Sequence, residues 1–510
     1  MVRATLKRTI IAGGQVYDHD GDTDQPPVAD IMIEGDKIVR IGKGLARRAA
    51  GARIVDAAGK LVIPGFVNAH YHSHDVLLRG SFENLPTEIW FMYALPPSYP
   101  KRSKREVRAR TLLAAAEAIR NGITTLQDML TILPFDPEHL DLVLDTYAEV
   151  GLRVVFALQF ADLRALDRVP YWRECVPKKF QDKLVAAADA SGVKVDPMAN
   201  VEAAYRANKD RHPRLHWALG PTNPAMCSPA SLARVAAFSE QHALPVYTHF
   251  YQSRAEAVAA RRLMTQYDGS LAAFLKSVGL LNRRLTLAHS IWVAPDEINE
   301  LTNAGAGVVL NIASNMKSKG GIPPIREYVA AGTRIALGSD NSACSDAQNM
   351  FQQMKLLASM AAVSDPAPGP PSAADALRYA TLGGAATAGL DHTIGALKPG
   401  MKADLSILDL SAASFLPLNS AARQLVFTEG GGSVESVMVD GEFVMWKRKL
   451  TTIDEAALKA ELKAVMPALR RDAAQVAARN AKILPHLLEA YRRSWSDDLG
   501  MDRYVGRYRN

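Results

Sequence analysis

Cysteine is scarce in this sequence of 510 residues, and long apolar runs are missing. The cysteines, Cys175, Cys227 and Cys344, are odd in number and lack CxxC or zinc-finger spacing, which argues against a disulfide framework and a cysteine metal site. No run approaches the roughly 18 apolar residues of a membrane helix, and the basic start leads only into a short apolar patch, unlike a secretory signal. We therefore expect a cytoplasmic protein that does not associate with a membrane.

Positive charge is in excess only near the C-terminus. The formal net charge is +7, and residues 446–510 alone contain 14 Lys and Arg against 8 Asp and Glu. Aromatic residues, 7% of the chain, are not interleaved with these charges as they would be in a nucleic-acid binding surface. We therefore predict that nucleic acid is not a partner.

Short β-branched runs alternate with alanine- and leucine-rich segments between residues 61 and 340. Helical segments such as 110–122 and 294–305 end at a glycine, which is typical of a helix C-terminus. Eight strand–helix repeats predict an α/β fold of the TIM (β/α)8 barrel type, whose chemistry takes place at the C-terminal ends of the strands. The eight runs are 61–68, 122–128, 153–158, 214–220, 245–249, 285–289, 306–312 and 334–340.

Both flanks of this region carry short alternating strands broken at Gly-Asp and Gly-Lys turns, which are hairpin signals. We expect them to pair into one small β-sandwich. The predicted division is residues 1–63 for the N-terminal part of the sandwich, 64–393 for the barrel, 394–450 for the C-terminal part of the sandwich, and 451–510 for a helical extension and tail.

The C-terminal extension reads as amphipathic helix from Ile453 to about Trp495, with interruptions expected at Pro467 and Pro485. These helices either pack on the barrel or form an oligomer contact. We expect residues 497–510 to be a frayed tail.

Three histidines alternate in "NAHYHSH", residues 68–74. Alternate side chains of an extended strand share a face, so His70, His72 and His74 could all face one metal ion. Four strand ends of a barrel can arrange imidazole and carboxylate ligands around an open position, as a zinc-like metal requires. Further polar residues at predicted strand ends are His249, His289, Asn311 and Asp340.

Four segments of the chain resemble the amidohydrolase superfamily, and within it the branch of aminoheterocycle deaminases and triazine hydrolases, which includes the atrazine chlorohydrolases. The resemblance covers most of residues 1–450. It implies a metal-dependent hydrolase that acts on carbon–nitrogen bonds other than peptide bonds in a small cyclic or aromatic substrate. The segments are "PGFVNAHYHSHDVLLRG" (64–80), "TLAHSIWVAPDEI" (286–298), "SNMKSKGGIPPIREYVAAGTRIALGSDNSACSDAQNMFQQMK" (314–355) and "IGALKPGMKADLSILD" (394–409).

The resemblance also assigns roles by register. Counted back from "LLRG", the family's metal pair falls on His70 and His72, so His74 either faces the substrate or packs in its loop. The remaining implied metal ligands are His249 and Asp340, and Asp340 also takes the proton of the attacking water. His289 is implied to polarise the bond under attack.

The family's two-metal members bridge their ions with a lysine at the end of strand four, where this chain reads "HWALGPTNP" without a lysine. We therefore expect one divalent metal per chain, with zinc preferred over iron or manganese. His216, inside that strand, is interpreted as a buried hydrogen-bonded histidine.

Gln252 stands where family deaminases carry a proton-donating glutamate, and an amide cannot act as an acid. Either His74, Glu83 or Glu256 replaces that glutamate, or the leaving group of an amide, urea, carbamate or chlorinated ring needs no such help. Two other departures are Thr222, where a histidine is common, and Asn341, where a glycine is common.

Substrate contacts are expected from Gln252, His74, Asn315 and Trp292, with Trp90, Phe91 and Tyr93 as further pocket residues or as packing. The leading hypothesis is a deaminase-like hydrolase of a small molecule, and the enzyme alternative is a hydrolase with a different leaving group. A non-catalytic scaffold is a remote alternative, since it predicts lost ligands. The family resemblance further implies a homo-oligomer, a dimer or larger.

Overall fold

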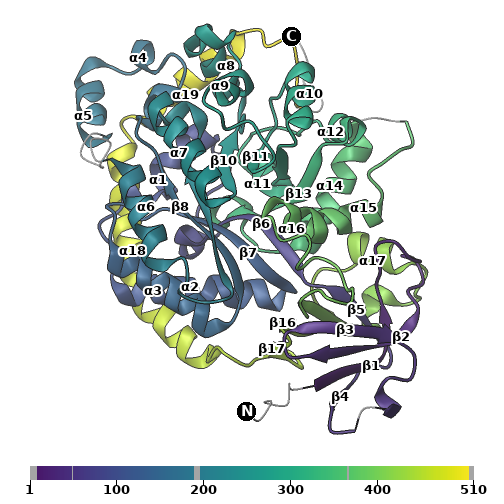
Figure 1. The fold of residues 1–510 in the computed structure, drawn as a ribbon. Coiled ribbons are helices and arrows are strands. Elements are labelled where there is room, and N and C mark those ends of the chain that lie inside the picture. The colour runs from purple at the N-terminus through teal and green to yellow at the C-terminus, as the bar shows by residue number, and fades with distance from the viewer. Residues whose placement is uncertain (1–7, 49, 189–195, 365–366, 505–510) are drawn as a thin grey trace.

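The computed structural model describes residues 8–48, 50–188, 196–364 and 367–504. Two sheets form within these ranges, a parallel sheet in the middle of the chain and a mixed sheet built from both ends. Figure 1 shows the parallel sheet surrounded by helices, with the mixed sheet to one side of it.

The parallel strands pair in sequence order from β6 to β13, and β14 returns to pair with β6, Asp340 opposite Tyr71. Since β14 follows β13 after two residues, the eighth strand joins β12 to β6 and closes the ring. This confirms the predicted TIM barrel. Its strands are β6 (Phe66–His72), β7 (Ile123–Leu130), β8 (Arg153–Phe160), β9 (Leu215–Pro221), β10 (Val246–Phe250), β11 (Leu285–His289), β12 (Gly307–Leu310), β13 (Arg334–Leu337) and β14 (Asp340–Asn341).

The first predicted run, 61–68, was wrong as a single strand. Its beginning belongs to β5 (Lys60–Pro64) of the mixed sheet, and the barrel begins at Phe66. The chain changes sheet at Gly65, where an added Cβ would lie 2.2 Å from Thr124 Oγ1. Only glycine permits this close approach between the two sheets.

Helices cover the outside of the barrel, and the two predicted segments correspond to α2 and α10. None of the helices within the described ranges is both long and apolar enough to cross a bilayer. Their bounds are α1 (Thr87–Ala94), α2 (Lys104–Arg120), α3 (Pro137–Val150), α4 (Trp172–Cys175), α5 (Lys178–Ala188), α6 (Pro197–Asn208), α7 (Pro229–His242), α8 (Arg254–Leu263), α9 (Leu271–Ser277), α10 (Pro295–Asn303), α11 (Ile312–Lys317), α12 (Ile325–Ala331), α13 (Ser342–Ser345), α14 (Met350–Ser364), α15 (Ala373–Arg378), α16 (Gly384–Thr387), α17 (Ala421–Phe427), α18 (Glu455–Asn480) and α19 (Leu484–Arg493).

The mixed sheet joins the two ends of the chain through β5, which pairs antiparallel with β15 and parallel with β1. Its apolar core combines side chains of both ends, such as Ile31, Val62 and Leu405. This confirms the predicted sandwich of N- and C-terminal segments. The strands are β1 (Arg8–Val16), β2 (Val28–Glu34), β3 (Lys37–Gly42), β4 (Arg53–Asp56), β5 (Lys60–Pro64), β15 (Leu405–Asp409), β16 (Val434–Val439), β17 (Glu442–Trp446) and β18 (Lys449–Leu450).

The C-terminal extension departs from expectation in two places. The predicted break at Pro467 is wrong, because α18 runs through it with Val465 and Leu469 buried on either side. Proline removes one backbone donor there, and the packing of both halves keeps the helix continuous. Pro485 lies in the first turn of α19, where a missing N–H costs no hydrogen bond.

The prediction of a frayed tail is also wrong for residues 497–504. Leu499 is buried, Ile322 N–H donates to Arg503 O, and Tyr504 Oη donates to Lys319 O. The segment therefore packs on the loops at the C-terminal end of the barrel strands. Residues 505–510 of the expected tail, like residues 1–7 of the expected sandwich, lie outside the described residues.

Candidate metal centre

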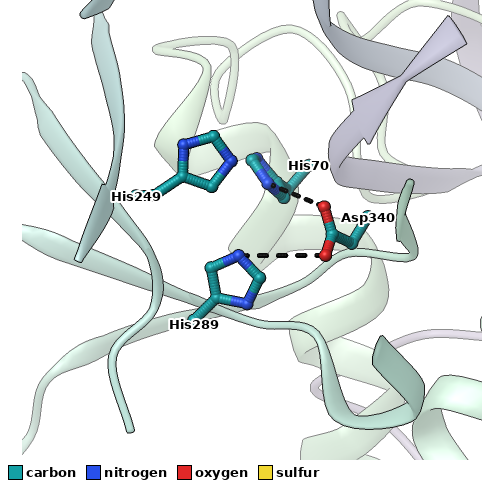
Figure 2. A group of neighbouring side chains, drawn as sticks. All are labelled: His70, His249, His289 and Asp340. Atoms are coloured by element: carbon teal, nitrogen blue, oxygen red, sulfur yellow. Dashed lines mark ion pairs between the residues drawn. The ribbon is translucent and has the colours of Figure 1, made fainter. Parts of the chain in front are cut away.

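Four strand ends bring together three of the predicted metal ligands and His289, the residue predicted to polarise the bond under attack. Figure 2 shows the side chains of His70, His249, His289 and Asp340 directed toward one point. One nitrogen or oxygen of each lies within 4.8 Å of those of the others, and all four residues are buried. They come from β6, β10, β11 and β14, so the parallel barrel explains how residues 270 positions apart in sequence share one site.

His72, two residues after His70 on β6, belongs to the same group. Its Nε2 lies 3.2 Å from His70 Nε2, 3.2 Å from His249 Nε2 and 3.4 Å from Asp340 Oδ1. His70 Nε2 is also 3.4 Å from Asp340 Oδ1. Ligands bonded to a tetrahedral zinc at about 2.0–2.2 Å are separated from each other by roughly 3.3–3.6 Å. The spacing of these four atoms therefore suits a metal ion.

The hydrogen bonds of two histidines show why a cation is needed. Nδ1 of His72 donates to Met129 O at 2.6 Å, and Nδ1 of His249 donates to Thr222 O at 2.5 Å. Since a carbonyl oxygen only accepts, the neutral rings carry their protons on Nδ1 and direct bare Nε2 lone pairs at each other. These lone pairs repel unless a cation lies between them. The donor set therefore fits a metal such as zinc, with the backbone carbonyls orienting the ligands.

Asp340 is held in a strained backbone conformation with one oxygen bound. Its φ is +62°, in the left-handed region, and Ser314 Oγ donates to Oδ2 at 2.5 Å. Oδ1 is buried and has no hydrogen-bond partner among the described residues. Burial alone would raise the pKa of Asp340, but the electrostatic influence of the nearby His289, His70 and His72 imidazoles outweighs it and holds the pKa well below its usual range.

His289 has a similar arrangement beside the metal ligands. Its φ is +71°, and Nδ1 donates to Asn315 Oδ1 at 2.8 Å. Its Nε2 lies 3.8 Å from Asp340 Oδ2 and has no hydrogen-bond partner within the described part of the chain. Strained residues with unpaired buried atoms are typical of a functional site.

The junction between the first and last barrel strands positions Asp340. Asn68 accepts from Ser339 N and donates to Ser339 Oγ at 2.7 Å, which ties β6 to the residue before Asp340. At Gly338 an added Cβ would lie 2.7 Å from His70 Cβ and 2.5 Å from Asn311 Oδ1. A side chain at position 338 would therefore push the first and last ligands apart.

His74 contacts other partners than the metal group. Its Nδ1 accepts from Thr131 N at 3.4 Å, and its Nε2 lies 3.3 Å from Asn341 Nδ2. Asn341, one of the departures from the family pattern, thus pairs with the extra histidine of "HYHSH". The role of His74 toward a substrate stays a prediction.

Gln252 is placed near the metal group by β10 but differs from the carboxylate beside it. Its side chain is buried, and Oε1 has no hydrogen-bond partner that the structure describes. Glu256 is saturated, because it accepts from Asn223 Nδ2 at 2.6 Å, from the N–H groups of Tyr251 and Gln252, and from Arg168 at 2.9 Å. Both oxygens of Glu256 are therefore already engaged, and Glu83 is exposed.

Most of the aromatic side chains expected in the pocket pack against other apolar residues of the protein. Trp292 is fully buried and its indole N–H donates to Gly320 O at 2.7 Å. Trp90, Phe91 and Tyr93 lie on α1 in apolar clusters.

His216 lies 3.5 Å from Arg153 Nη1 at the opposite end of the barrel, away from the metal group.

Sequence reasoning missed Ser314 and Glu88. Ser314 precedes Asn315 in a matched segment, so its position was a usable signal. Glu88 lies on α1, and Ser253 Oγ donates to its Oε1. Nothing in the sequence of α1 indicates this contact with a residue at the end of β10.

Comparison with known proteins agrees with this geometry. The model of the amidohydrolase family matches residues 61–444. A 5-methylthioadenosine/S-adenosylhomocysteine deaminase of Pyrococcus furiosus is 30% identical over 428 residues, which cover 84% of this chain and 93% of the relative. A deaminase of the same name from Syntrophomonas wolfei is 28% identical, covering 84% and 92%.

Two solved structures share the fold. A zinc-bound adenosine deaminase of Xanthomonas campestris has a TM-score of 0.78 and 26% identity, with 91% of this chain and 98% of that chain covered. A zinc complex of atrazine chlorohydrolase from Arthrobacter aurescens has a TM-score of 0.78 and 25% identity, covering 90% and 100%. These findings confirm the resemblance inferred from the sequence. The chain belongs to the amidohydrolase family and is a hydrolase.

Proposed function

We propose that this protein is a mononuclear zinc enzyme that hydrolyses the amino group from a small aminoheterocycle and releases ammonia. The observation that carries the proposal is the arrangement around His72 Nε2, which lies 3.2 Å from the Nε2 atoms of His70 and His249 and 3.4 Å from Asp340 Oδ1, with His289 beside this group. Relatives named as deaminases of adenine-containing compounds, and zinc in the adenosine deaminase neighbour, support the leaving group and the metal.

Four residues would hold the metal ion, and one of them, Asp340, also acts as the base. A zinc ion held by His70, His72, His249 and Asp340 would lower the pKa of a bound water toward neutrality. Asp340 is the base that accepts the proton of the attacking water, because its carboxylate lies beside the histidine ligands and its position is set by Ser314.

His289 and its neighbours act on the substrate. Asn315 holds the His289 ring so that Nε2 faces the same space as Asp340, where the imidazole stabilises the charge that develops on the attacked group. We propose that Gln252, His74, Asn315 and Trp292 line the substrate pocket.

A second candidate function follows from Gln252 itself. An amide cannot protonate a ring nitrogen or a departing amine. If no other acid serves, the same metal site would act on a leaving group that departs unaided, such as that of an amide, urea, carbamate or chlorinated ring.

An ammonia assay separates the two functions. Zinc-loaded protein would be offered adenine nucleosides including methylthioadenosine, amino-pyrimidines, amino-triazines and pterins, while ultraviolet absorbance follows amides, ureas and chlorinated rings. We expect ammonia from at least one amino-substituted ring. Turnover of the second group alone would contradict the deaminase proposal and establish the second candidate.

A further inference from the structure

Glu88 is a buried carboxyl that contacts Ser253, the residue after Gln252, and that the mechanism does not yet use. It lies in the first turn of α1, and its Oε1 accepts from Oγ of Ser253, the residue after Gln252. Its Oε2 is buried without a hydrogen-bond partner among the residues that the structure describes. Glu88 thus has one oxygen anchored at the end of β10 and one oxygen open to a ligand.

The neighbouring carboxylates do not share this property. Glu256, four residues after Gln252, accepts from Asn223, Arg168 and two backbone N–H groups, so neither oxygen is open. A carboxylic acid with an unpaired oxygen can give and retake a proton, whereas a saturated carboxylate serves as a structural anchor.

The C-terminal segment is anchored to α8, the helix that follows Ser253. Arg254 donates to the carbonyl oxygens of Ser494 and Asp497, which holds the segment against α8. The Tyr504 ring stacks on Trp495 at 5.1 Å and contacts Trp292 at 5.4 Å.

The electrostatic surroundings of Glu88 favour its acid form. Burial raises the pKa of Glu88 above its usual range, the hydrogen bond from Ser253 and the charge of Arg168 lower it, and Glu256 raises it. The other titratable groups that interact with Glu88 are Tyr491 on α19 and Tyr504 in the tail, and Arg254 on α8 acts on both tyrosines.

We propose that Glu88 is the acid that protonates the ring nitrogen of the substrate, the step that Gln252 cannot perform. This inference rests on the proposed deaminase function. Glu88 gives its proton to the ring nitrogen while the oxygen of water bonds to the amino-bearing carbon. Asp340 passes the proton taken from that water to the amine, which leaves as ammonia. The new hydroxyl then returns its remaining proton to Glu88 as the carbonyl forms, so the acid is restored.

The test compares Glu88→Gln with wild-type protein on an amino ring from which the wild type releases ammonia. Glutamine keeps the size and an acceptor for Ser253, so we expect kcat to fall by about 10²–10⁴-fold with KM and zinc content nearly unchanged. The matched control is Glu297→Gln, since Glu297 is a buried carboxylate held by Ser270, Tyr251 and Ala294 N–H. It should keep the wild-type kcat.

A rescue variant makes the assignment specific. In Glu88→Gln combined with Gln252→Glu, an acid returns at the position next to Ser253, and we expect kcat to recover at least about tenfold over Glu88→Gln alone. If Glu88→Gln does not fold, Glu88→Asp keeps an acid but withdraws it by one methylene, and kcat should still fall at least about tenfold.

The outcomes separate the two proposals. Wild-type protein that releases no ammonia from any ring overturns the proposed function and this inference with it. Ammonia release by wild type together with an unchanged kcat in folded, zinc-loaded Glu88→Gln, or in Glu88→Asp, overturns the role of Glu88 and leaves the deaminase function standing.

Discussion

Two buried clusters of charged residues lie at opposite ends of the barrel, and they differ in how completely their atoms are paired. At the N-terminal ends of the strands, Arg153 binds Asp404 at 3.0 Å and Asp440 at 2.5 Å, and Arg214 binds Asp440 at 3.0 Å. At the C-terminal ends, Asp340 Oδ1 and His289 Nε2 lack any hydrogen-bond partner among the described residues.

The difference separates a structural cluster from a chemical one. The Arg153 cluster neutralises its own charge and joins the barrel to the mixed sheet, since Asp404 and Asp440 flank β15 and β16. The metal group gathers lone pairs that only a ligand can satisfy, at residues with strained backbone. Burial and charge alone would not distinguish them.

The largest expected effect is that of Asp340→Asn. An amide cannot accept the proton of water, so hydrolysis should fall by about 10³-fold or more while the protein stays folded, as measured by steady-state kinetics and circular dichroism. The matched variant Asp404→Asn at the other end should keep the wild-type kcat. Loss of hydrolysis in Asp404→Asn, or its retention in Asp340→Asn, would contradict the distinction between a structural cluster at one end of the barrel and a catalytic group at the other.

Arg153→Met should act on stability alone. Removing the guanidinium leaves Asp404 and Asp440 buried and unpaired, so the free energy of unfolding should fall by about 3–5 kcal/mol in denaturant titration. The kcat of the remaining folded protein should match that of wild type. A lower kcat at full folding would mean that this end of the barrel also controls the chemistry.

Ser314→Ala sharpens the assignment of Asp340. A hydrogen bond to a charged group contributes about 1.5–3 kcal/mol, so its loss should lower kcat by roughly 10- to 100-fold without loss of zinc. Ser318→Ala is the control, because Ser318 Oγ donates to the Ser314 carbonyl on the same helix and does not contact the site. Equal effects of both substitutions would point to helix stability instead.

The smallest expected effect is that of His74→Ala on metal content. His74 contacts Thr131 and Asn341, so the variant should bind as much zinc as wild type by elemental analysis. His72→Ala should lose its zinc. Loss of zinc from His74→Ala would show that the wrong pair was chosen from "HYHSH".

The barrel could be predicted from sequence because its evidence is local. Each strand is a short buried run, and its polar ligand falls at the run's end, so His249, His289 and Asp340 were found without knowledge of the fold. The errors at 61–68, Pro467 and residues 497–504 share one cause. Sheet membership, continuity of a proline-containing helix and docking of a tail depend on distant packing partners.

The site could likewise be predicted where its residues lie at the ends of barrel strands, but not where they come from other elements. Residues on strand ends converge by symmetry of the barrel, whereas Ser314 lies on α11 and Glu88 on α1, outside the barrel strands. The contact of Glu88 with Ser253 spans 165 positions, and nothing in the local sequence of either residue indicates it.

Zinc titration of the metal-free protein, with hydrolysis measured at each addition, tests the central claim most directly. We predict that metal-free protein is inactive and that activity rises linearly with zinc and stops at one ion per chain, because the described part of the chain holds one such group of metal ligands. Full activity without metal, or a rise that continues to two ions per chain, would contradict a mononuclear metal-dependent hydrolase.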